Sequence, residues 1–484
     1  MPRQTGSMAD APTLTSASVA DAVAYLRIWW PARRAHTRTP GVQAALWFDD
    51  GLVLSLADGV AHLATGEPLT TEHLFRVASH SKTFTGAALH RLHEQGRVRL
   101  DDSLGQWIGW LAESGSPLAD RTVAEVLSHG AGITRDGRDA NHWQLHEPFL
   151  DAEGLRRVVA DDAEITAANV RFKYSNIGYS LLGEVIEAVT GTTWRDHVRT
   201  ELMEPLGLTS TFPDLGDLDP ARFAGAHSFQ ALGATRVAID QVDSGAMSSA
   251  TGVVSTASDL CRWAAAQFTG DERVLSDASK RRMQNRVWTV EGEGEGEYGL
   301  GTGILDVGGR RLCGHGGGWP GHITRTFFDP DAKLAVAVAT NAIDGPAAEM
   351  AGGSVRIVDL AARNAARSER DGDGIGPDRR KAAQRVCGRY ASLWGVHDVA
   401  LLGDRLVGLS PTLPEPATAA VHYTMVDDTT LRIESGPGHG SVGEELHFEL
   451  DASGSVRRVS GAGVTLVPLD DLRLPDRVTL GTSW

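Results

Sequence analysis

The stretch FRVASHSKTFTGAAL, residues 75–89, places Ser79 three positions before Lys82, where a short apolar run gives way to a helical pattern. The pattern predicts a helix over 79–95, with Gly96 after its last residue. Apolar residues recur on one side of this helix: Phe84, Ala88, Leu89 and Leu92. Because residues three apart share a helix face, we expect the Ser79 hydroxyl and the Lys82 amine to lie side by side.

Lysine is rare in this sequence. Of the 46 basic residues, five are lysines, at positions 82, 173, 280, 333 and 381, and the other 41 are arginines. Arginine serves wherever a cation sits on the surface, but its guanidinium stays protonated near neutral pH. Lys82 is therefore a candidate for a function that requires a deprotonated amine.

The spacing of Ser79 and Lys82 suits nucleophilic catalysis. A serine that attacks an acyl group needs a base within hydrogen-bond reach and donors for the oxyanion that forms. The amine supplies the base, and the helix N-terminus supplies unsatisfied N–H groups and a partial positive charge. The pattern is weak on its own because serine is common, and an exposed lysine near a capping serine is the alternative.

A second group of polar residues, Tyr174-Ser175-Asn176, stands immediately before a predicted helix. A tyrosine in such a loop can relay a proton between a serine and a leaving group. Asn176 can donate and accept hydrogen bonds to an amide substrate. The alternative is that Tyr174 only packs and that Asn176 caps the helix.

The third group is His315 and the three glycines after it, within LCGHGGGWPGHITRTFF. Glycines on a strand let a substrate backbone approach closely, and Gly318 would expose an N–H as a second oxyanion donor. His315 would polarise the lysine and tyrosine or bind a carboxylate. The alternative is a strand-end histidine satisfied by the backbone.

Composition excludes several functions. Acidic residues outnumber basic ones 62 to 46, and no basic cluster would neutralise phosphates, so we expect no nucleic-acid partner. No run approaches the roughly 20 apolar residues that span a bilayer, and the first residues lack the order of a secretory signal. We therefore expect a cytoplasmic protein that does not contact the membrane. Because no His-Glu-x-x-His is present, and glycine-rich sequence separates His315 from His322, we expect no metal and no other cofactor.

The catalytic domain is predicted to have an α+β fold. Strand-like runs at 42–48 and 52–57 flank an Asp-Asp-Gly turn, and strand-like runs return over 298–342. The sequence between about 100 and 290 is mostly helical in pattern. Strands at both ends of a helical middle predict one antiparallel sheet, closed by distant segments, with helices packed on it.

The rest of the chain predicts a second domain. We expect the catalytic domain to cover residues 1–365 and a charged, Gly-rich linker to cover 366–381. Short alternating runs with frequent turns over 382–484 predict a small β-barrel or sandwich.

In order and separation, the three motifs resemble those of the serine β-lactamase and penicillin-binding protein superfamily. The similar branch contains class C-like β-lactamases, D-alanyl-D-alanine carboxypeptidases, D-aminopeptidases and family VIII esterases. Other segments resemble the family in the same order: LDDSLGQWIGWL, TVAEVLSHGAGI, YSNIGYSLLGEVIEAVTG, PLGLTSTF and VVSTASDLCRW. The resemblance covers about residues 40 to 345. It implies the following roles: nucleophile Ser79, general base Lys82, proton relay Tyr174, substrate-positioning Asn176, and a third motif of His315 with Gly317.

The sequence departs from most β-lactamases at the third motif. His315 stands where they have lysine, which is similar to D-aminopeptidase and D,D-carboxypeptidase members and disfavours efficient β-lactam hydrolysis. His322 stands where relatives often carry an aromatic residue, so we expect it and Trp319 to contact the substrate. The C-terminal segment is similar to the lipocalin-like domain fused to some peptidase members.

The leading hypothesis is a serine hydrolase that forms an acyl-enzyme at Ser79. Its substrate would be a small peptide that contains D-amino acids, or an ester. A second hypothesis keeps the chemistry but passes the acyl group to an amine, as in a stand-alone thioesterase, peptide cyclase or acyltransferase. A third is a binding protein that retains the fold without catalysis. The sequence leaves the acyl group, its stereochemistry and the oligomeric state open.

Overall fold

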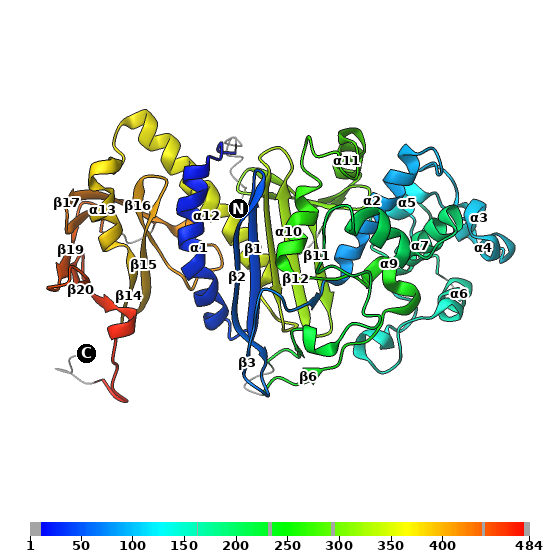
Figure 1. The fold of residues 1–484 in the computed structure, drawn as a ribbon, viewed down its shortest axis with the longest axis horizontal. Coiled ribbons are helices and arrows are strands. Elements are labelled where there is room, and N and C mark those ends of the chain that lie inside the picture. Colours follow the sequence, from blue (N-terminus) through cyan, green and yellow to red (C-terminus); the bar gives the residue numbers. More distant parts are fainter. Residues whose placement is uncertain (1–10, 162, 231–234, 292–295, 438–440, 479–484) are drawn as a thin grey trace. The chain divides into compact units, whose positions relative to one another are not determined.

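The computed structural model describes residues 11–161, 163–230, 235–291, 296–437 and 441–478 (Figure 1). The chain divides into two compact units. One unit is residues 37–351, and the other joins residues 1–36 to residues 352–484.

The larger unit is built on an antiparallel sheet. Its described strands are β1 (Gly41–Phe48), β2 (Gly51–His62), β3 (Glu67–Pro68), β8 (Trp288–Val290), β9 (Gly296–Tyr298), β10 (Gly303–Val307), β11 (Arg310–Trp319), β12 (His322–Asp329) and β13 (Leu334–Thr340). Their order is β3-β2-β1-β13-β12-β11-β10-β9-β8. β1 pairs with β13 from Val42 opposite Thr340 to Phe48 opposite Leu334. This pairing joins the two distant groups of strands, as the sequence predicts.

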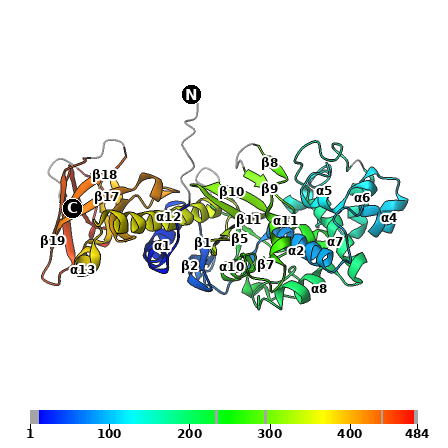
Figure 2. The same cartoon turned by 90° about the horizontal axis from the view of Figure 1, so that it is seen from above.

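Helices cover the sheet and form a separate helical region beside it (Figures 1 and 2). The described helices are α2 (Ser81–Glu94), α3 (Leu104–Trp107), α4 (Gly109–Glu113), α5 (Val123–Leu127), α6 (Ala152–Ala160), α7 (Asn176–Thr190), α8 (Trp194–Val198), α9 (Ser248–Thr251), α10 (Ala257–Ala265) and α11 (Asp277–Gln284). α10 packs on β1, β12 and β13, whereas α2 packs against α7 and α9. A short pair of strands, β4 (Phe75–Arg76) with β7 (Val254–Ser255), fixes the chain that leads into α2.

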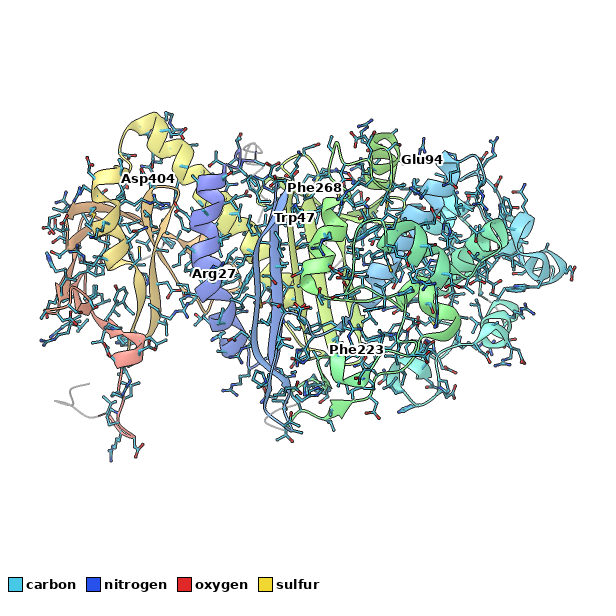
Figure 3. All side chains as sticks on the ribbon, in the orientation of Figure 1. Arg27, Trp47, Glu94, Phe223, Phe268 and Asp404 are labelled. Atoms are coloured by element: carbon cyan, nitrogen blue, oxygen red, sulfur yellow. The ribbon has the colours of Figure 1, made fainter. Side chains whose placement is uncertain are left out.

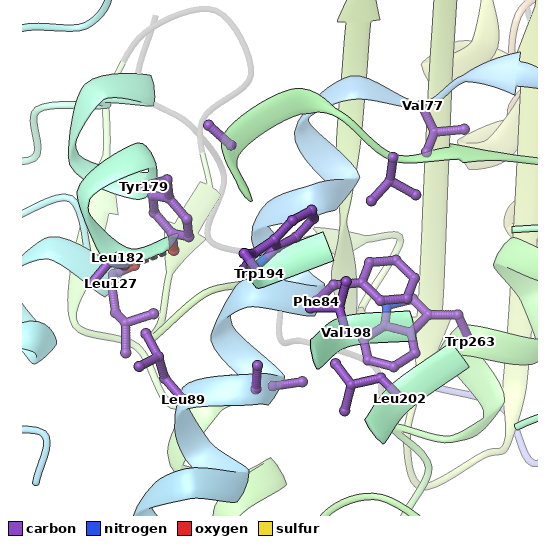
Figure 4. Close-up of a cluster of buried hydrophobic side chains, with 14 of the residues drawn as sticks. Val77, Phe84, Leu89, Leu127, Tyr179, Leu182, Trp194, Val198, Leu202 and Trp263 are labelled. Atoms are coloured by element: carbon purple, nitrogen blue, oxygen red, sulfur yellow. Dashed lines mark hydrogen bonds between the residues drawn. The ribbon is translucent and has the colours of Figure 1, made fainter. Parts of the chain in front are cut away.

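The core of this unit surrounds α2. The rings of Phe84 and Trp263 stack with centroids 4.0 Å apart, and the Tyr179 hydroxyl donates to the Leu127 carbonyl at 2.6 Å (Figure 4). Buried phenylalanines such as Phe268 extend the apolar packing along the unit (Figure 3). Because α2 is buried on almost every side, its first turn is held in place by tertiary packing as well as by its own hydrogen bonds.

The smaller unit contains α1 (Ser16–His36), the C-terminal part of α12 (Ala347–Asp371), α13 (Gly376–Val386) and a closed barrel. The described barrel strands are β14 (Gly388–Ser392), β15 (Gly395–Leu402), β16 (Arg405–Leu409), β17 (Val421–Asp427), β18 (Thr430–Ser435), β19 (Glu445–Leu450), β20 (Val456–Gly461) and β21 (Val464–Pro468). The Tyr25 hydroxyl of α1 donates to Asp398 of β15 at 3.1 Å. The predicted β-barrel is confirmed.

Residues 366–381 differ from the expected linker in their secondary structure. They contain the end of α12 and the beginning of α13. α13 continues to Val386, and its apolar residues Ala382, Ala383 and Val386 are buried in the barrel core. The many charges and glycines before these three residues make this short apolar face difficult to recognise in the sequence. No helix in the described parts of the chain is both long enough and apolar enough to cross a membrane.

Replacing Phe84 tests the packing around α2. Phe84→Ala removes a fully buried ring and its stacking contact with Trp263, so we expect the free energy of unfolding to fall by about 3 to 5 kcal/mol. Urea unfolding followed by tryptophan fluorescence measures the change. Phe229→Ala, whose ring is 58% exposed, is the control, and an equal loss in both variants would contradict this account of the core.

Candidate active site

Ser79 lies in a 3-10 turn, Ala78–His80, that leads directly into α2. The backbone of Ala78 has φ +45°, in the left-handed region that an alanine seldom adopts. This turn leaves Ser79 half-buried while its neighbours Ala78 and His80 are buried. The sequence predicted a single helix from Ser79. The structure instead places the serine just before the α-helix.

Lys82 points into the protein interior and is fully buried. Its Nζ lies 3.3 Å from Ser79 Oγ, 2.7 Å from Asn176 Oδ1 and 2.8 Å from the carbonyl oxygen of Ala250 in α9. Burial lowers the pKa of Lys82 well below its usual value, and Arg135 lowers it further, whereas Asp136 acts in the opposite direction. The amine is therefore driven toward its neutral form.

The contacts of Lys82 determine where its lone pair points. A neutral amine has two hydrogens and one lone pair. The Ala250 carbonyl only accepts hydrogen bonds. Asn176 also accepts from Lys82, because its Nδ2 donates to Asp136 at 2.6 Å and this turns Oδ1 toward Nζ. With both hydrogens used, the lone pair remains for the hydroxyl proton of Ser79.

Asn176 is free for this contact because Ser175 caps α7. The Ser175 hydroxyl accepts from the Gly178 N–H at 2.8 Å, which satisfies the first turn of the helix. Asn176 is therefore the first helical residue rather than the capping residue. Its buried side chain links Lys82 to Asp136, and it holds the base in place instead of facing a substrate.

Tyr174 completes the group around the serine. Its phenol is close enough for the Ser79 hydroxyl to lower its pKa, and Lys82 Nζ lies 4.8 Å from the centre of its ring. Burial raises the pKa of Tyr174, so the phenol keeps its proton near neutral pH. The environments of Lys82 and Tyr174 thus favour opposite functions, because the amine accepts a proton and the phenol carries one.

His315 is buried beside this group but is hydrogen-bonded on both ring nitrogens. Nδ1 lies 2.6 Å from the Gly316 carbonyl, which only accepts, so Nδ1 carries the proton. Nε2 therefore accepts from the Tyr298 hydroxyl at 3.2 Å. Burial lowers the pKa of His315 well below its usual value. With this geometry His315 is a neutral group. A neutral imidazole is poorly suited to bind the carboxylate of a substrate.

The glycines of β11 bring this strand against the nucleophile. β11 last pairs with β10 at Gly314, and His315 to Trp319 continue beside β12. A Cβ on Gly317 would lie 2.0 Å from the carbonyl oxygen of Val77, so only glycine fits there. The next residue, Gly318, is exposed. Its N–H remains a predicted oxyanion donor.

Trp319 and His322 occupy different environments from one another. Trp319 is buried but forms part of the wall of a cavity, which is described below. His322 is fully buried, accepts from the Arg76 N–H at 3.0 Å and donates to the Ala224 carbonyl at 3.0 Å. Burial lowers the pKa of His322 to about 3. The position of His322 therefore does not support the expected contact with a substrate, because both ring nitrogens bind backbone groups.

The structure adds residues that the sequence reasoning missed. Asp136 orients Asn176, and the ring of His129 packs on Tyr174 at 4.2 Å. Tyr298 fixes His315, as described above. Arg325 lines a cavity of about 230 Å³ together with Tyr174 and His315, and burial lowers its pKa to about 10. No local pattern in the sequence marks these residues.

Metal ligation finds no support in the side chains. Within the described ranges, no three His, Cys, Asp or Glu residues come together in a group that would hold a metal ion.

Comparison with known proteins identifies the family. The family described as Beta-lactamase matches residues 24–359, which is more than half of the chain. This chain belongs to the beta-lactamase family. Membership makes it a serine hydrolase, and the resemblance stated from the sequence is confirmed.

This beta-lactamase-family chain is similar to several characterised proteins. Penicillin-binding protein 4 of Amycolatopsis lactamdurans is 29% identical over 64% of this chain and 83% of its own length. A D-aminopeptidase of Brucella anthropi is 26% identical over 64% of this chain and 58% of its own length. The octameric penicillin-binding protein homologue from Pyrococcus abyssi has a similar fold, with 20% identity, a TM-score of 0.60, and coverage of 92% of this chain and 99% of that one.

The charge of Asp136 gives a testable pH effect. Asp136→Asn keeps a side-chain oxygen that can accept the hydrogen bond from Asn176 Nδ2. It removes the negative charge that raises the pKa of Lys82. We therefore expect the acid limb of the kcat/KM profile for an activated ester to move to lower pH. Asp139→Asn, at an exposed position, is the control and should leave the limb in place. A shift to higher pH in Asp136→Asn would contradict the proposed coupling.

Proposed function

We propose that this member of the beta-lactamase family cleaves peptide or ester bonds through an acyl-enzyme formed on Ser79. The observation that carries the proposal is the position of the buried Lys82 Nζ, which lies 3.3 Å from Ser79 Oγ and has the oxygens of Asn176 and Ala250 as its other partners. A buried neutral amine in this position is a base for the serine hydroxyl near neutral pH.

The first half of the reaction forms the acyl-enzyme. Ser79 Oγ attacks the carbonyl carbon while its proton passes to Lys82 Nζ. The oxyanion accepts hydrogen bonds from the backbone N–H groups of Ser79 and Gly318. When the tetrahedral intermediate collapses, the bond to the leaving group breaks. Tyr174 gives its proton to the departing nitrogen or oxygen and regains one from Lys82.

The second half releases the acyl group. Water attacks the ester carbonyl of the acyl-enzyme and gives a proton to Lys82 by way of Tyr174. Breakdown of this second intermediate expels Ser79 Oγ, which recovers its proton from Lys82. The products are a carboxylic acid and the free enzyme, so the base, the relay and the nucleophile all return to their initial states.

The proposed substrates are small peptides or amides that contain a D-amino acid, with esters as a second class. The similarity to a D-aminopeptidase supports this choice. The neutral state of His315 supports it as well, because β-lactamases generally have a cationic lysine at the corresponding position.

Labelling of the nucleophile tests the proposal. We expect a fluorophosphonate to modify Ser79, as located by mass spectrometry, and Ser79→Ala to lose the label. Lys82→Arg replaces the neutral amine with a guanidinium that stays protonated and cannot take up the serine proton, so labelling should slow by about 10² to 10⁴-fold. Lys333→Arg, at a side chain that is 48% exposed, is the matched control. Labelling at full rate in Lys82→Arg, or at another residue, would contradict the mechanism.

A further inference from the structure

Two cavities border β11, the strand that packs against the turn of Ser79. The smaller, of about 230 Å³, is lined by Tyr174 and His315, and the larger, of about 700 Å³, is lined by Gly318 and Trp319 at the end of β11. In the proposed function, on which this inference rests, Tyr174 protonates the leaving group. The leaving group therefore lies toward the smaller cavity, and the acyl chain extends toward the larger one.

The larger cavity shares part of its apolar wall with the residue that precedes the nucleophile. Trp319 belongs to an apolar cluster that includes Ala78, the residue before Ser79, and Trp143 and Leu145 pack against this cluster. Trp143 and Leu145 line the cavity, and the fully buried Trp319 forms part of its wall. An acyl chain attached to Ser79 and directed along β11 would therefore meet apolar surface first.

The wall of this cavity is rigid and aromatic. The ring of Trp319 stacks on that of Phe149, with centroids 4.8 Å apart and planes inclined by 10°. The rings of Trp143 and Trp319 pack edge to face, with centroids 5.7 Å apart. The guanidinium of Arg76 lies over the Trp319 ring, 3.8 Å from its centre. Arg76 is itself buried and forms an ion pair with Asp214. The wall is thus preformed, which reduces the entropy lost when a ligand binds.

The mouth of the cavity exposes apolar side chains to solvent. Phe229 is 58% exposed and Ile343 is 37% exposed, although both are large hydrophobic residues. Among the described residues that line this cavity, the charged ones are Arg135 and Asp240. Exposed apolar side chains gathered at a cavity mark a ligand site more often than an inert surface.

We infer that the acyl side of the substrate is bulky and apolar, with an aromatic residue next to the scissile carbonyl. The cavity volume of about 700 Å³ lies in the range of sites that enclose whole small ligands, so it accommodates more than a methyl side chain. The residues that select the substrate are Trp143, Leu145, Phe229, Trp319 and Ile343.

Matched substrates test this inference. We expect N-acetyl-phenylalanine 4-nitroanilide to exceed N-acetyl-alanine 4-nitroanilide in kcat/KM by at least about tenfold, in whichever of the D and L series is cleaved. Ile343→Trp fills the mouth and should lower this ratio by about tenfold. Leu52→Trp on β2, where Leu52 is 38% exposed, should leave the ratio unchanged.

The outcomes separate the inference from the proposed function. A wild-type preference for alanine, or an unchanged ratio in Ile343→Trp, would overturn the inference even if Ser79 is acylated. If no substrate acylates Ser79, the proposed function fails. Equilibrium binding of N-acetyl-phenylalaninamide, followed by tryptophan fluorescence, then decides the inference, because binding that is equal in wild type and Ile343→Trp would overturn it.

Discussion

The burial of a single amine organises this active site. A charged ammonium inside a protein is costly, so Lys82 must either pair with a carboxylate or lose its proton. Its direct partners are neutral acceptors, and the nearest carboxylate, Asp136, acts through the amide of Asn176. Three segments meet at this amine: the first turn of α2, the start of α7 and α9. The packing of the helical region is therefore what sets the protonation state of the base.

The same burial separates two groups that titrate in a similar range in water. It lowers the pKa of the amine and raises the pKa of the Tyr174 phenol, so that a base and a proton donor coexist beside one serine. The glycines of β11 complete the arrangement, because they let a strand pass within contact of the nucleophile turn. The helical region thus supplies the reactive groups, from a turn, a loop and a helix, and the sheet brings β11 against them.

The sequence predicts what depends on local spacing and misses what depends on tertiary contact. Ser79 and Lys82 are three residues apart where a 3-10 turn leads into α2, so their proximity follows from local spacing. Asp136 reaches Asn176 across 40 positions of sequence, and nothing in its own neighbourhood marks it. His322 has the position of a binding residue in the motif, but its burial and its two backbone partners are properties of the folded chain. The sequence predicts the sheet from continuous apolar runs and a turn signal, and the barrel from short alternating runs, because these patterns are local.

The protonation state of Lys82 is the central claim, and NMR of lysine labelled at Cε and Nζ measures it most directly. The chain has five lysines, so the spectrum is simple, and Lys82→Arg assigns the resonance by removing it. We predict that Lys82 has the chemical shift of a neutral amine near neutral pH and titrates far below the usual lysine pKa of about 10.4. A shift typical of an ammonium that persists into the alkaline range would contradict the account.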